Sequence, residues 1–296
     1  MNRPRIESAD DPSWNGSELA DEGRLIGDVL VESGALRPTD VDGVRHWQAK
    51  HGLRFGEAAM QLGLVSNTAV SEALAHQYRY PRLLDPLGAL SNELVIAQQP
   101  NHRLSEQLRT LRSQLLVHWG AAKANHSVAI VSTARGEGRS FIAANLALAF
   151  AQVNLRTLLL DLDLRRPRQH ELFGLSNWRG VSSVLIGRVS PSEAQIAQAS
   201  TLSVMTCGPI PPNPQELLSP AALTPLLEEL QCNHDVVVID TPAWSSGADA
   251  LLISAQVQET LLVSRPDHAL QHPTRQMVGA LRRAGVRIVG AVLNER

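Results

Sequence analysis

The stretch VAIVSTARGEGRSF, residues 128–141, is the centre of the fold that this sequence predicts. It passes from an apolar segment through a glycine-rich turn into a helix-forming segment, which is the context that a phosphate-binding P-loop requires. Gly136 and Gly138 let main-chain N–H groups turn toward a polyphosphate, and the start of the helix adds free amides and its dipole. The residues of the predicted nucleotide cradle are Thr133, Ala134, Arg135, Gly136, Glu137, Gly138, Arg139, Ser140 and Phe141.

Two positions of this loop depart from the usual P-loop pattern. Thr133 replaces the first glycine, and Arg139 stands where a lysine is usual. Arginine keeps the positive charge but presents a planar fork in place of a compact ammonium group, so the two are not equivalent at a phosphate site. The loop alone therefore leaves two alternatives open, a nucleotide site or a chance glycine-rich turn.

Three aspartates favour the nucleotide site. LLLDLDLRRP (158–167) ends an apolar run in Asp161 and Asp163, and VVVIDTP (236–242) ends another in Asp240. The carboxyl ends of parallel strands meet at one edge of a sheet, where ligands bind. Carboxylates there, together with the Ser140 hydroxyl, suit Mg²⁺, and one of them is a candidate to accept a proton from an attacking hydroxyl.

Apolar runs and helical patterns alternate along residues 101–296, after a first helix over residues 104–120. Most runs lack period-two alternation, as expected for parallel strands that are covered on both faces. We predict an α/β fold with a doubly wound, mostly parallel sheet of the P-loop NTPase type. The predicted strands are Val128–Ser132, Thr157–Asp163, Leu202–Cys207, Val236–Asp240, Thr260–Ser264 and Val286–Leu293. The predicted helices between and after them are Ser140–Gln152, Ala221–Gln231, Ala248–Val257 and Gln271–Ala284.

An internal duplication precedes this domain. Gly27, Gly34 and Gln48 recur 29 residues later as Gly56, Gly63 and Gln77, within the segments LIGDVLVESGAL and RFGEAAMQLGLV. Apolar residues at helical spacing end in a glycine in both copies, which predicts two stacked helix–turn–helix units over residues 24–80. We expect residues 1–23 to be a disordered tail and residues 81–100, with three prolines, to be a linker.

The composition narrows the class of protein. A formal net charge of −2 gives no electrostatic sign of a nucleic-acid partner. Cys207 and Cys232 form neither a disulfide framework nor a zinc motif. Residues 1–22 lack the apolar region of a signal peptide, and no apolar run is long enough to span a membrane. We expect a cytoplasmic protein that reaches a membrane through a partner.

In this order, VSTARGEGRS, LLLDLDLRRP and VVVIDTP resemble the Walker A, Walker A′ and Walker B boxes of bacterial tyrosine kinases, the autokinases of capsule and exopolysaccharide assembly. The E-x-x-R-x-x-R helix of that family has its counterpart in Glu106, Arg109 and Arg112, and the stretch 211–218 (PPNPQELL) is also typical. DLRRPRQHELFGL (163–175) and VLNE (292–295) resemble the chain-length-determinant kinase subfamily, where an arginine at the position of Arg139 is regular.

The resemblance implies ATP and Mg²⁺ as cofactors. Arg139 would act on the phosphates, Ser140, Asp163 and Asp240 would hold the metal, and Asp161 would be the catalytic base. The helix with Glu106, Arg109 and Arg112 would mediate homo-oligomerisation, whereas the residues alone favour local ion pairs. The partner would be an inner-membrane chain-length determinant, with the protein peripheral to that membrane. The duplicated domain resembles the N-terminal domains of type II secretion and pilus ATPases.

Departures from the family keep alternatives open. The chain ends in VLNER without a tyrosine cluster, and Tyr78 and Tyr80 are its only tyrosines. A kinase regulating exopolysaccharide polymerisation therefore competes with a catalytically weak, ATP-gated assembly module and with a ParA- or MinD-like positioning ATPase. For the duplicated domain, the resemblance suggests cyclic di-GMP at Leu25–Gly27 and Arg54–Gly56, but we favour a protein-docking role.

Overall fold

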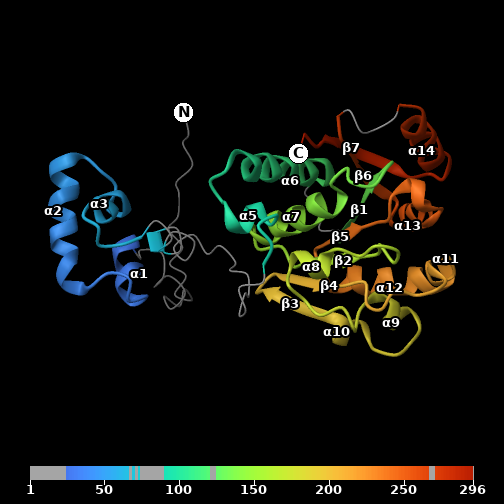
Figure 1. Ribbon diagram of the computed structural model, residues 1–296, viewed down its shortest axis with the longest axis horizontal. Helices are drawn as coiled ribbons and strands as arrows, with labels where there is room; N and C mark the ends of the chain where they lie inside the picture. Colours follow the sequence, from blue (N-terminus) through green and yellow to red (C-terminus); the bar gives the residue numbers. More distant parts are fainter. Residues whose placement is uncertain are drawn as a thin grey trace, which may run out of the picture. The chain divides into compact units, whose positions relative to one another are not determined.

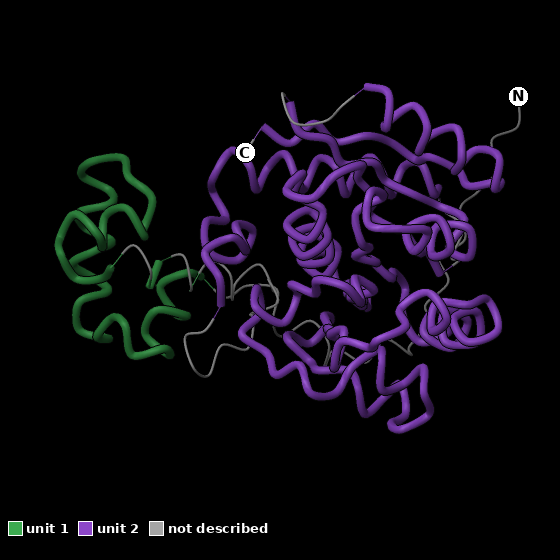
Figure 2. The backbone as a smooth tube through the Cα atoms, turned by 45° about the vertical axis from the view of Figure 1, so that its right-hand side comes forward, with its two compact units in different colours: residues 1–80 green, residues 81–296 purple. Residues whose placement is uncertain are grey.

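The computed structural model describes residues 25–66, 69–70, 73, 90–120, 125–266 and 271–295. The chain divides into two compact units, residues 1–80 and residues 81–296 (Figure 2). The predicted tail over residues 1–23, the tyrosines Tyr78 and Tyr80, and Gln77 lie outside the described residues. No helix in the described part of the chain is both long enough and apolar enough to cross a membrane.

The first unit shows the duplication in its helix ends. Its described elements are α1 (Ile26–Glu32), the 3₁₀ helix η1 (Pro38–Asp40), α2 (Val41–His51) and α3 (Phe55–Gln61). At the start of α1 the Asp28 carboxylate accepts a hydrogen bond from Leu25 N at 3.2 Å, and at the start of α3 Glu57 accepts one from Arg54 N at 2.9 Å. Both helices are followed by a glycine in the left-handed region, Gly34 at φ 72° and Gly63 at φ 67°.

The two copies pack on each other through equivalent residues. A Cβ atom at Gly27 would lie 3.1 Å from Cζ of Phe55, and one at Gly56 would lie 3.5 Å from Cδ1 of Ile26 and 2.7 Å from Cγ1 of Val70. The residue before each repeated glycine therefore packs on the glycine of the other copy. This close approach gives a physical reason for glycine at both positions.

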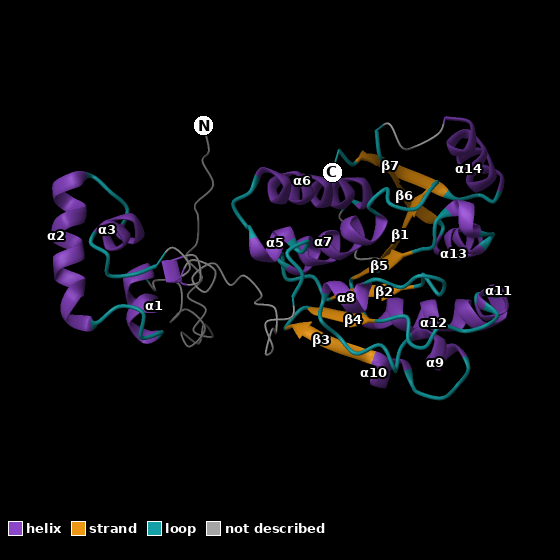
Figure 3. Ribbon diagram, in the orientation of Figure 1, coloured by secondary structure: helices purple, strands orange, loops and turns teal. Residues whose placement is uncertain are grey.

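The second unit is built on a seven-stranded sheet in the order β3-β4-β2-β5-β1-β6-β7 (Figures 1 and 3). All neighbouring pairs are parallel except β3 and β4, so the predicted fold class is confirmed. The antiparallel edge strand β3 has no counterpart among the predicted strands. The strands are β1 (His126–Ser132), β2 (Thr157–Asp161), β3 (Gln195–Ala199), β4 (Leu202–Met205), β5 (Val236–Asp240), β6 (Glu259–Ser264) and β7 (Arg287–Leu293).

Helices cover both faces of the sheet (Figure 1). Val128 and Ile130 of β1 pack in one apolar cluster with α5, α6 and α7, while Ala129 and Val131 pack in a second with α12, α13 and α14. This split follows from the alternation of side chains along a strand. The helices of this unit are α5 (Val95–Gln98), α6 (Arg103–Trp119), α7 (Arg139–Ala151), α8 (Gln169–Leu172), α9 (Val181–Leu185), α10 (Pro191–Ala194), α11 (Pro214–Leu217), α12 (Pro220–Asn233), η2 (Trp244–Ser246), α13 (Asp249–Val257) and α14 (Gln271–Arg283).

Residues 94–96, within the range 81–100 that the sequence analysis assigns to the linker, pack into the core of the second unit. Leu94, Val95 and Ile96 are each at most 2% exposed. The buried Asn145 of α7 holds this segment, because its Oδ1 accepts from Ile96 N at 3.2 Å and its Nδ2 donates to Glu93 O at 2.9 Å. The helix in this segment is a single turn, too short for its burial to produce a periodic sequence signal.

Candidate nucleotide-binding site

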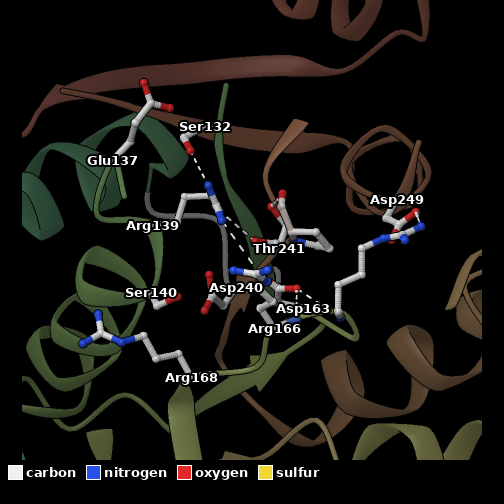
Figure 4. Close-up of polar contacts among 12 residues, drawn as sticks. Ser132, Glu137, Arg139, Ser140, Asp163, Arg166, Arg168, Asp240, Thr241 and Asp249 are labelled. Atoms are coloured by element: carbon white, nitrogen blue, oxygen red, sulfur yellow. Dashed lines mark hydrogen bonds and ion pairs between the residues drawn. The ribbon is translucent and has the colours of Figure 1, made fainter. Parts of the chain in front are cut away.

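The sheet register brings the predicted aspartates together. Asp161, the last residue of β2, lies opposite Asp240, the last residue of β5, and Asp240 also lies opposite Ile130 of β1. The P-loop follows β1 after Ser132, so loop and carboxylates share the carboxyl edge of the sheet (Figure 4). This juxtaposition is the one that parallel strands predict.

The P-loop is ordered by its own side chains. Gly136 and Gly138 have φ of 76° and 96°, a region that favours glycine. Glu137 is fully buried, and its carboxylate accepts a hydrogen bond from Ala134 N at 2.7 Å. Asn294 Nδ2 donates to the main-chain oxygen of Glu137 at 3.0 Å, and a Cβ at Gly138 would clash with the same amide. The loop therefore forms a preshaped turn at the start of α7.

Arg139 points back into the protein. Its Nε donates to Thr241 O at 2.9 Å, and its Nη1 donates to Ala134 O at 2.9 Å and to the Ser132 hydroxyl. Its Nη2 lies 3.9 Å from Oδ2 of Asp163, and the side chain is only 8% exposed. The guanidinium group thus binds the loop to the ends of β1 and β5 (Figure 4), and phosphates would have to compete with these contacts.

Asp161 shapes the loop after β2. Its Oδ1 accepts from Asp163 N at 3.1 Å, and its Oδ2 accepts from Arg168 N at 3.2 Å and Gln169 N at 3.1 Å. The side chain is fully buried, and burial, with the nearby Asp240 charge, raises the pKa of Asp161 well above its usual range. In this conformation Asp161 is a loop-forming residue that a substrate hydroxyl does not reach.

Ser140, Asp163 and Asp240 supply the oxygen donors expected for a metal. The Ser140 hydroxyl interacts with the Asp240 carboxylate, and burial raises the pKa of Asp240 to about 6. Asp163 Oδ1 accepts from Arg165 N at 3.2 Å and Arg166 N at 2.9 Å. Among the described residues no three His, Cys, Asp or Glu side chains form a ready metal cage. Mg²⁺ does not need one, because it commonly takes one or two carboxylates plus phosphates and waters.

Gln169 is a site residue that the sequence analysis missed. It is fully buried, and its Nε2 donates to Asp240 Oδ2 at 2.8 Å and to Ser140 O at 3.1 Å. Because its main-chain N–H also binds Asp161, it joins all three motifs. Its position within DLRRPRQH, six residues after Asp163, is the available signal, but a glutamine in a loop has no distinctive pattern.

Other members of the predicted cradle play smaller roles. Phe141 is buried in the core, so its contribution to a ligand is limited to its main chain. The Thr133 hydroxyl lies 3.0 Å from that of Thr274 on α14 and is likewise turned away from the loop's exposed tip. Arg135 and Gly136 are the exposed residues of that tip.

Two arginines after Asp163 make ion pairs around the site. Arg165 Nε lies 2.6 Å from Oδ2 of the buried Asp249 at the start of α13. Arg168 Nη2 lies 2.5 Å from Oε1 of Glu93, in the segment that precedes α5. The loop that carries Asp163 is therefore tied both to α13 and to the segment leading from the first unit.

The Glu106/Arg109/Arg112 motif lies on α6 and is not at the nucleotide site. Arg109 Nη1 lies 3.2 Å from Glu106 Oε2, its Nε donates to Gln152 at 3.4 Å, and Arg112 Nη1 donates to Ala149 O at 3.3 Å. Both arginines thus contact α7 or its end, whereas the Glu106 side chain is 72% exposed.

Comparisons with known proteins identify the family of the chain. The family model described as "ParA: NUBPL iron-transfer P-loop NTPase" matches residues 123–295. The chain is 32% identical over 203 residues to the putative tyrosine-protein kinase CapB of Staphylococcus aureus, covering 68% of this chain and 89% of CapB. It is 35% identical over 206 residues to tyrosine-protein kinase YwqD of Bacillus subtilis, covering 69% and 86%.

Solved structures of tyrosine kinase domains are also similar to this chain. The chimerical protein CapA2B2 is 33% identical with a TM-score of 0.64, over 76% of this chain and 98% of that one. The kinase domain of the Escherichia coli tyrosine kinase ETK is 31% identical with a TM-score of 0.64, over 68% and 79%. The cell division ATPase MinD of Pyrococcus furiosus is 26% identical with a TM-score of 0.51, over 57% and 72%.

Proposed function

The chain belongs to the bacterial tyrosine kinase family of P-loop NTPases, and on this basis we propose that it binds Mg-ATP and transfers the γ-phosphoryl group to tyrosine. The observation that carries the proposal is the convergence of Ser140, Asp163 and Asp240 beside the glycine-rich loop at one edge of the sheet. Oxygen donors next to a phosphate cradle are what phosphoryl transfer by a Mg-nucleotide requires.

The residues present fit the metal and the phosphates. In the part of the chain that the structure describes, Oδ1 of the buried Asp240 has no hydrogen-bond partner, so an acceptor is available for the metal or for one of its waters. α7 begins directly after the glycine-rich loop, so the positive end of its dipole adjoins the cradle and favours phosphate there. Bound Mg²⁺ would neutralise charge on the phosphates, with Ser140, Asp163 and Asp240 as its protein-side oxygens.

Asp161 is the proposed base, and in that role it depends on movement of the loop after β2. Its three main-chain donors hold it in place, and its raised pKa describes a group that takes up a proton readily. The loop is tied to the rest of the unit by the Arg168–Glu93 and Arg165–Asp249 pairs. A change in those pairs would be needed to open it.

The second candidate is a catalytically weak, ATP-gated assembly module, and the inward contacts of Arg139 favour it. Three hydrogen bonds hold the guanidinium away from the loop's exposed tip. Displacing a catalytic cation by about 1 Å can slow phosphoryl transfer about 100-fold. A ParA- or MinD-like positioning role has support from the shared fold, but Ala134 occupies the region where such ATPases usually carry a second lysine.

For the biological setting, we propose a regulator of exopolysaccharide polymerisation that acts with an inner-membrane chain-length determinant and self-associates through the exposed side of α6. The protein would be cytoplasmic and peripheral to that membrane. The first unit would dock a protein, and cyclic di-GMP at the Arg54 turn is the alternative. Arg54 is exposed there, as a ligand-binding arginine has to be. Calorimetric titration of the full chain with cyclic di-GMP decides between them, since heat at micromolar ligand supports the nucleotide.

Phosphotyrosine formation tests the kinase proposal. The full chain is incubated with Mg-ATP, alone and with the cytoplasmic tail of the chain-length determinant, and probed for phosphotyrosine. Phosphate on that tail, or on Tyr78 or Tyr80, supports the kinase. ATP binding without phosphotyrosine in either reaction supports the gating module.

A further inference from the structure

Gln169 bridges two of the nucleotide motifs, but this bridge uses only one end of its side-chain amide. Its Nε2 satisfies Asp240 Oδ2 at 2.8 Å and Ser140 O at 3.1 Å, which uses both hydrogens of the amide. Its Oε1, on the same amide, is buried and has no hydrogen-bond partner within the described residues. A buried acceptor without a donor is unfavourable, so a donor that binds there would be stabilised.

A second unpaired acceptor belongs to the carboxylate that Gln169 contacts. Asp240 Oδ1 is also buried and unpartnered in the described part of the chain, and its sister oxygen is the one bonded to Gln169. Each of these two acceptors can take a hydrogen bond from a water molecule. A water held by a metal ion is an especially good donor, because the ion polarises its O–H bonds.

We propose that Gln169 is an outer-sphere partner of the magnesium ion, with Oε1 accepting a hydrogen bond from a metal-bound water that also contacts Asp240. This inference rests on the proposed binding of Mg-ATP. Mg²⁺ keeps several of its waters when it binds protein, so acceptors for those waters are part of its site. Outer-sphere partners of this kind fix the orientation of the ligands that they contact.

The neutral amide suits this position. Asp161, Asp163 and Asp240 already place three carboxylates at this sheet edge, and without a bound cation they would repel a fourth negative charge. An amide accepts from the water while its other end donates to Asp240. Gln169 thereby aligns the carboxylate and the hydrated metal with the same side chain.

Nucleotide binding with and without the metal tests the proposal. The affinity of the full chain for a fluorescent ATP analogue is measured in Mg²⁺ and in EDTA, and Mn²⁺ binding with ADP is followed by electron paramagnetic resonance. Gln169→Met removes the acceptor and both donors, whereas Gln169→Glu removes both donors and keeps an acceptor, so the difference between the two variants isolates the acceptor. Gln256→Met, on α13, is the matched control, because Gln256 bonds to Leu218, Leu252 and Thr224, away from the site.

We expect only Gln169→Met to lose the dependence of nucleotide affinity on the metal. Gln169→Met should reduce the gain in nucleotide affinity that Mg²⁺ provides by about 10- to 100-fold, and it should reduce the affinity for Mn²⁺ by a similar factor. Its nucleotide affinity in EDTA should stay within about twofold of wild type. Gln169→Glu and Gln256→Met should retain most of the gain. Should Gln169→Met not fold, loss of the gain in a folded Gln169→Glu protein overturns the proposal.

Two other results are informative. Equal metal dependence in wild type and a folded Gln169→Met protein would reduce Gln169 to a structural bridge and overturn the inference, with the proposed function intact. Absence of nucleotide binding by the wild type in either buffer would instead overturn the proposed function, and the inference with it.

Discussion

Arg139 Nε donates a hydrogen bond to the main-chain oxygen of Thr241 at 2.9 Å, which fastens the P-loop to the residue that follows Asp240. With its bonds to Ala134 O and the Ser132 hydroxyl, the guanidinium group links the ends of β1 and β5. A lysine carries its three donors on a single nitrogen, whereas Arg139 meets these acceptors from two nitrogens, Nε and Nη1, so the two side chains are not interchangeable here. The arginine is therefore part of the loop's internal structure as well as a charge for the phosphates.

Replacing Arg139 with lysine should separate these two roles. We expect Arg139→Lys to lower the unfolding free energy of the ligand-free protein by about 1–3 kcal/mol, since buried acceptors lose their donors. Affinity for Mg-ATP should be equal or higher, because the phosphates no longer compete with internal contacts. Urea unfolding and calorimetry measure the two effects.

The control for that variant is Arg156→Lys, which alters an exposed pair with Asp235. It should change stability much less than Arg139→Lys does, because exposed ion pairs contribute little. Weaker nucleotide binding in a stable Arg139→Lys protein would show that the planar fork itself binds phosphate.

Asp161→Asn distinguishes a base from a loop former. If Asp161 acts only as a base, Asp161→Asn abolishes phosphoryl transfer and leaves Mg-ATP binding and stability near wild type. If Asp161 mainly holds the loop, Asp161→Asn reduces all three, because one of its two accepting oxygens becomes an NH₂ group that cannot accept from the main-chain donors. From the geometry we expect stability to fall by about 1–3 kcal/mol and binding to weaken. Unchanged binding and stability, with transfer lost, would contradict that expectation.

Asn145 should contribute substantially to stability, because its buried side chain bonds to several main-chain groups. It bonds to Ile96 N, Glu93 O and Phe141 O, so Asn145→Ala leaves buried main-chain groups unpaired and opens a small cavity. We expect a loss of about 2–4 kcal/mol in urea unfolding. Asn233→Ala, at the exposed end of α12, should cost less than about 0.5 kcal/mol. Equal losses would mean that the segment from Glu93 to Ile96 is not held through Asn145.

Glu106 is the exposed member of its motif and offers a test of self-association. Glu106→Arg should disrupt an oligomer that uses this side of α6, while the broken pair with Arg109 costs only about 0.2–0.5 kcal/mol. Sedimentation velocity with and without Mg-ATP measures the effect, with Glu228→Arg on α12 as control. An unchanged sedimentation profile for Glu106→Arg would exclude this side of α6 from the interface.

We expect the stability of the fold to depend on pH because of His234. Burial lowers the pKa of His234 below its usual 6.5, and Nδ1 lies 2.9 Å from Leu230 O. The folded chain therefore takes up this proton less readily than the unfolded chain. The contribution is complete above pH 6.5 and is lost as the pH falls below that value. His234→Asn should flatten the pH dependence of urea unfolding between about pH 7 and pH 5, and an equally steep dependence would contradict this assignment.

The parallel core of the fold follows from the sequence, because buried parallel strands produce uninterrupted apolar runs. The strand predicted at Val236–Asp240 coincides with β5, and the register of β2 and β5 accounts for the meeting of Asp161 and Asp240. Strand β3, Gln195–Ala199, has two glutamines at the sheet edge and lacks such a run.

Features that depend on contacts distant in the chain had no sequence signal. The burial of residues 94–96 depends on Asn145, about 50 positions later, and the role of Gln169 depends on Ser140 and Asp240. The inward direction of Arg139 likewise depends on Thr241 O, a main-chain atom whose position the sequence pattern does not specify.

Calorimetric titration of Mg-ATP into the full chain tests the central claim most directly. The site described here predicts saturable binding with a dissociation constant between about 1 μM and 1 mM, weakened when EDTA replaces Mg²⁺ and further weakened by Asp240→Asn. Absence of heat at millimolar Mg-ATP, from a protein that unfolds cooperatively, would contradict the assignment of a magnesium-nucleotide site at this edge of the sheet.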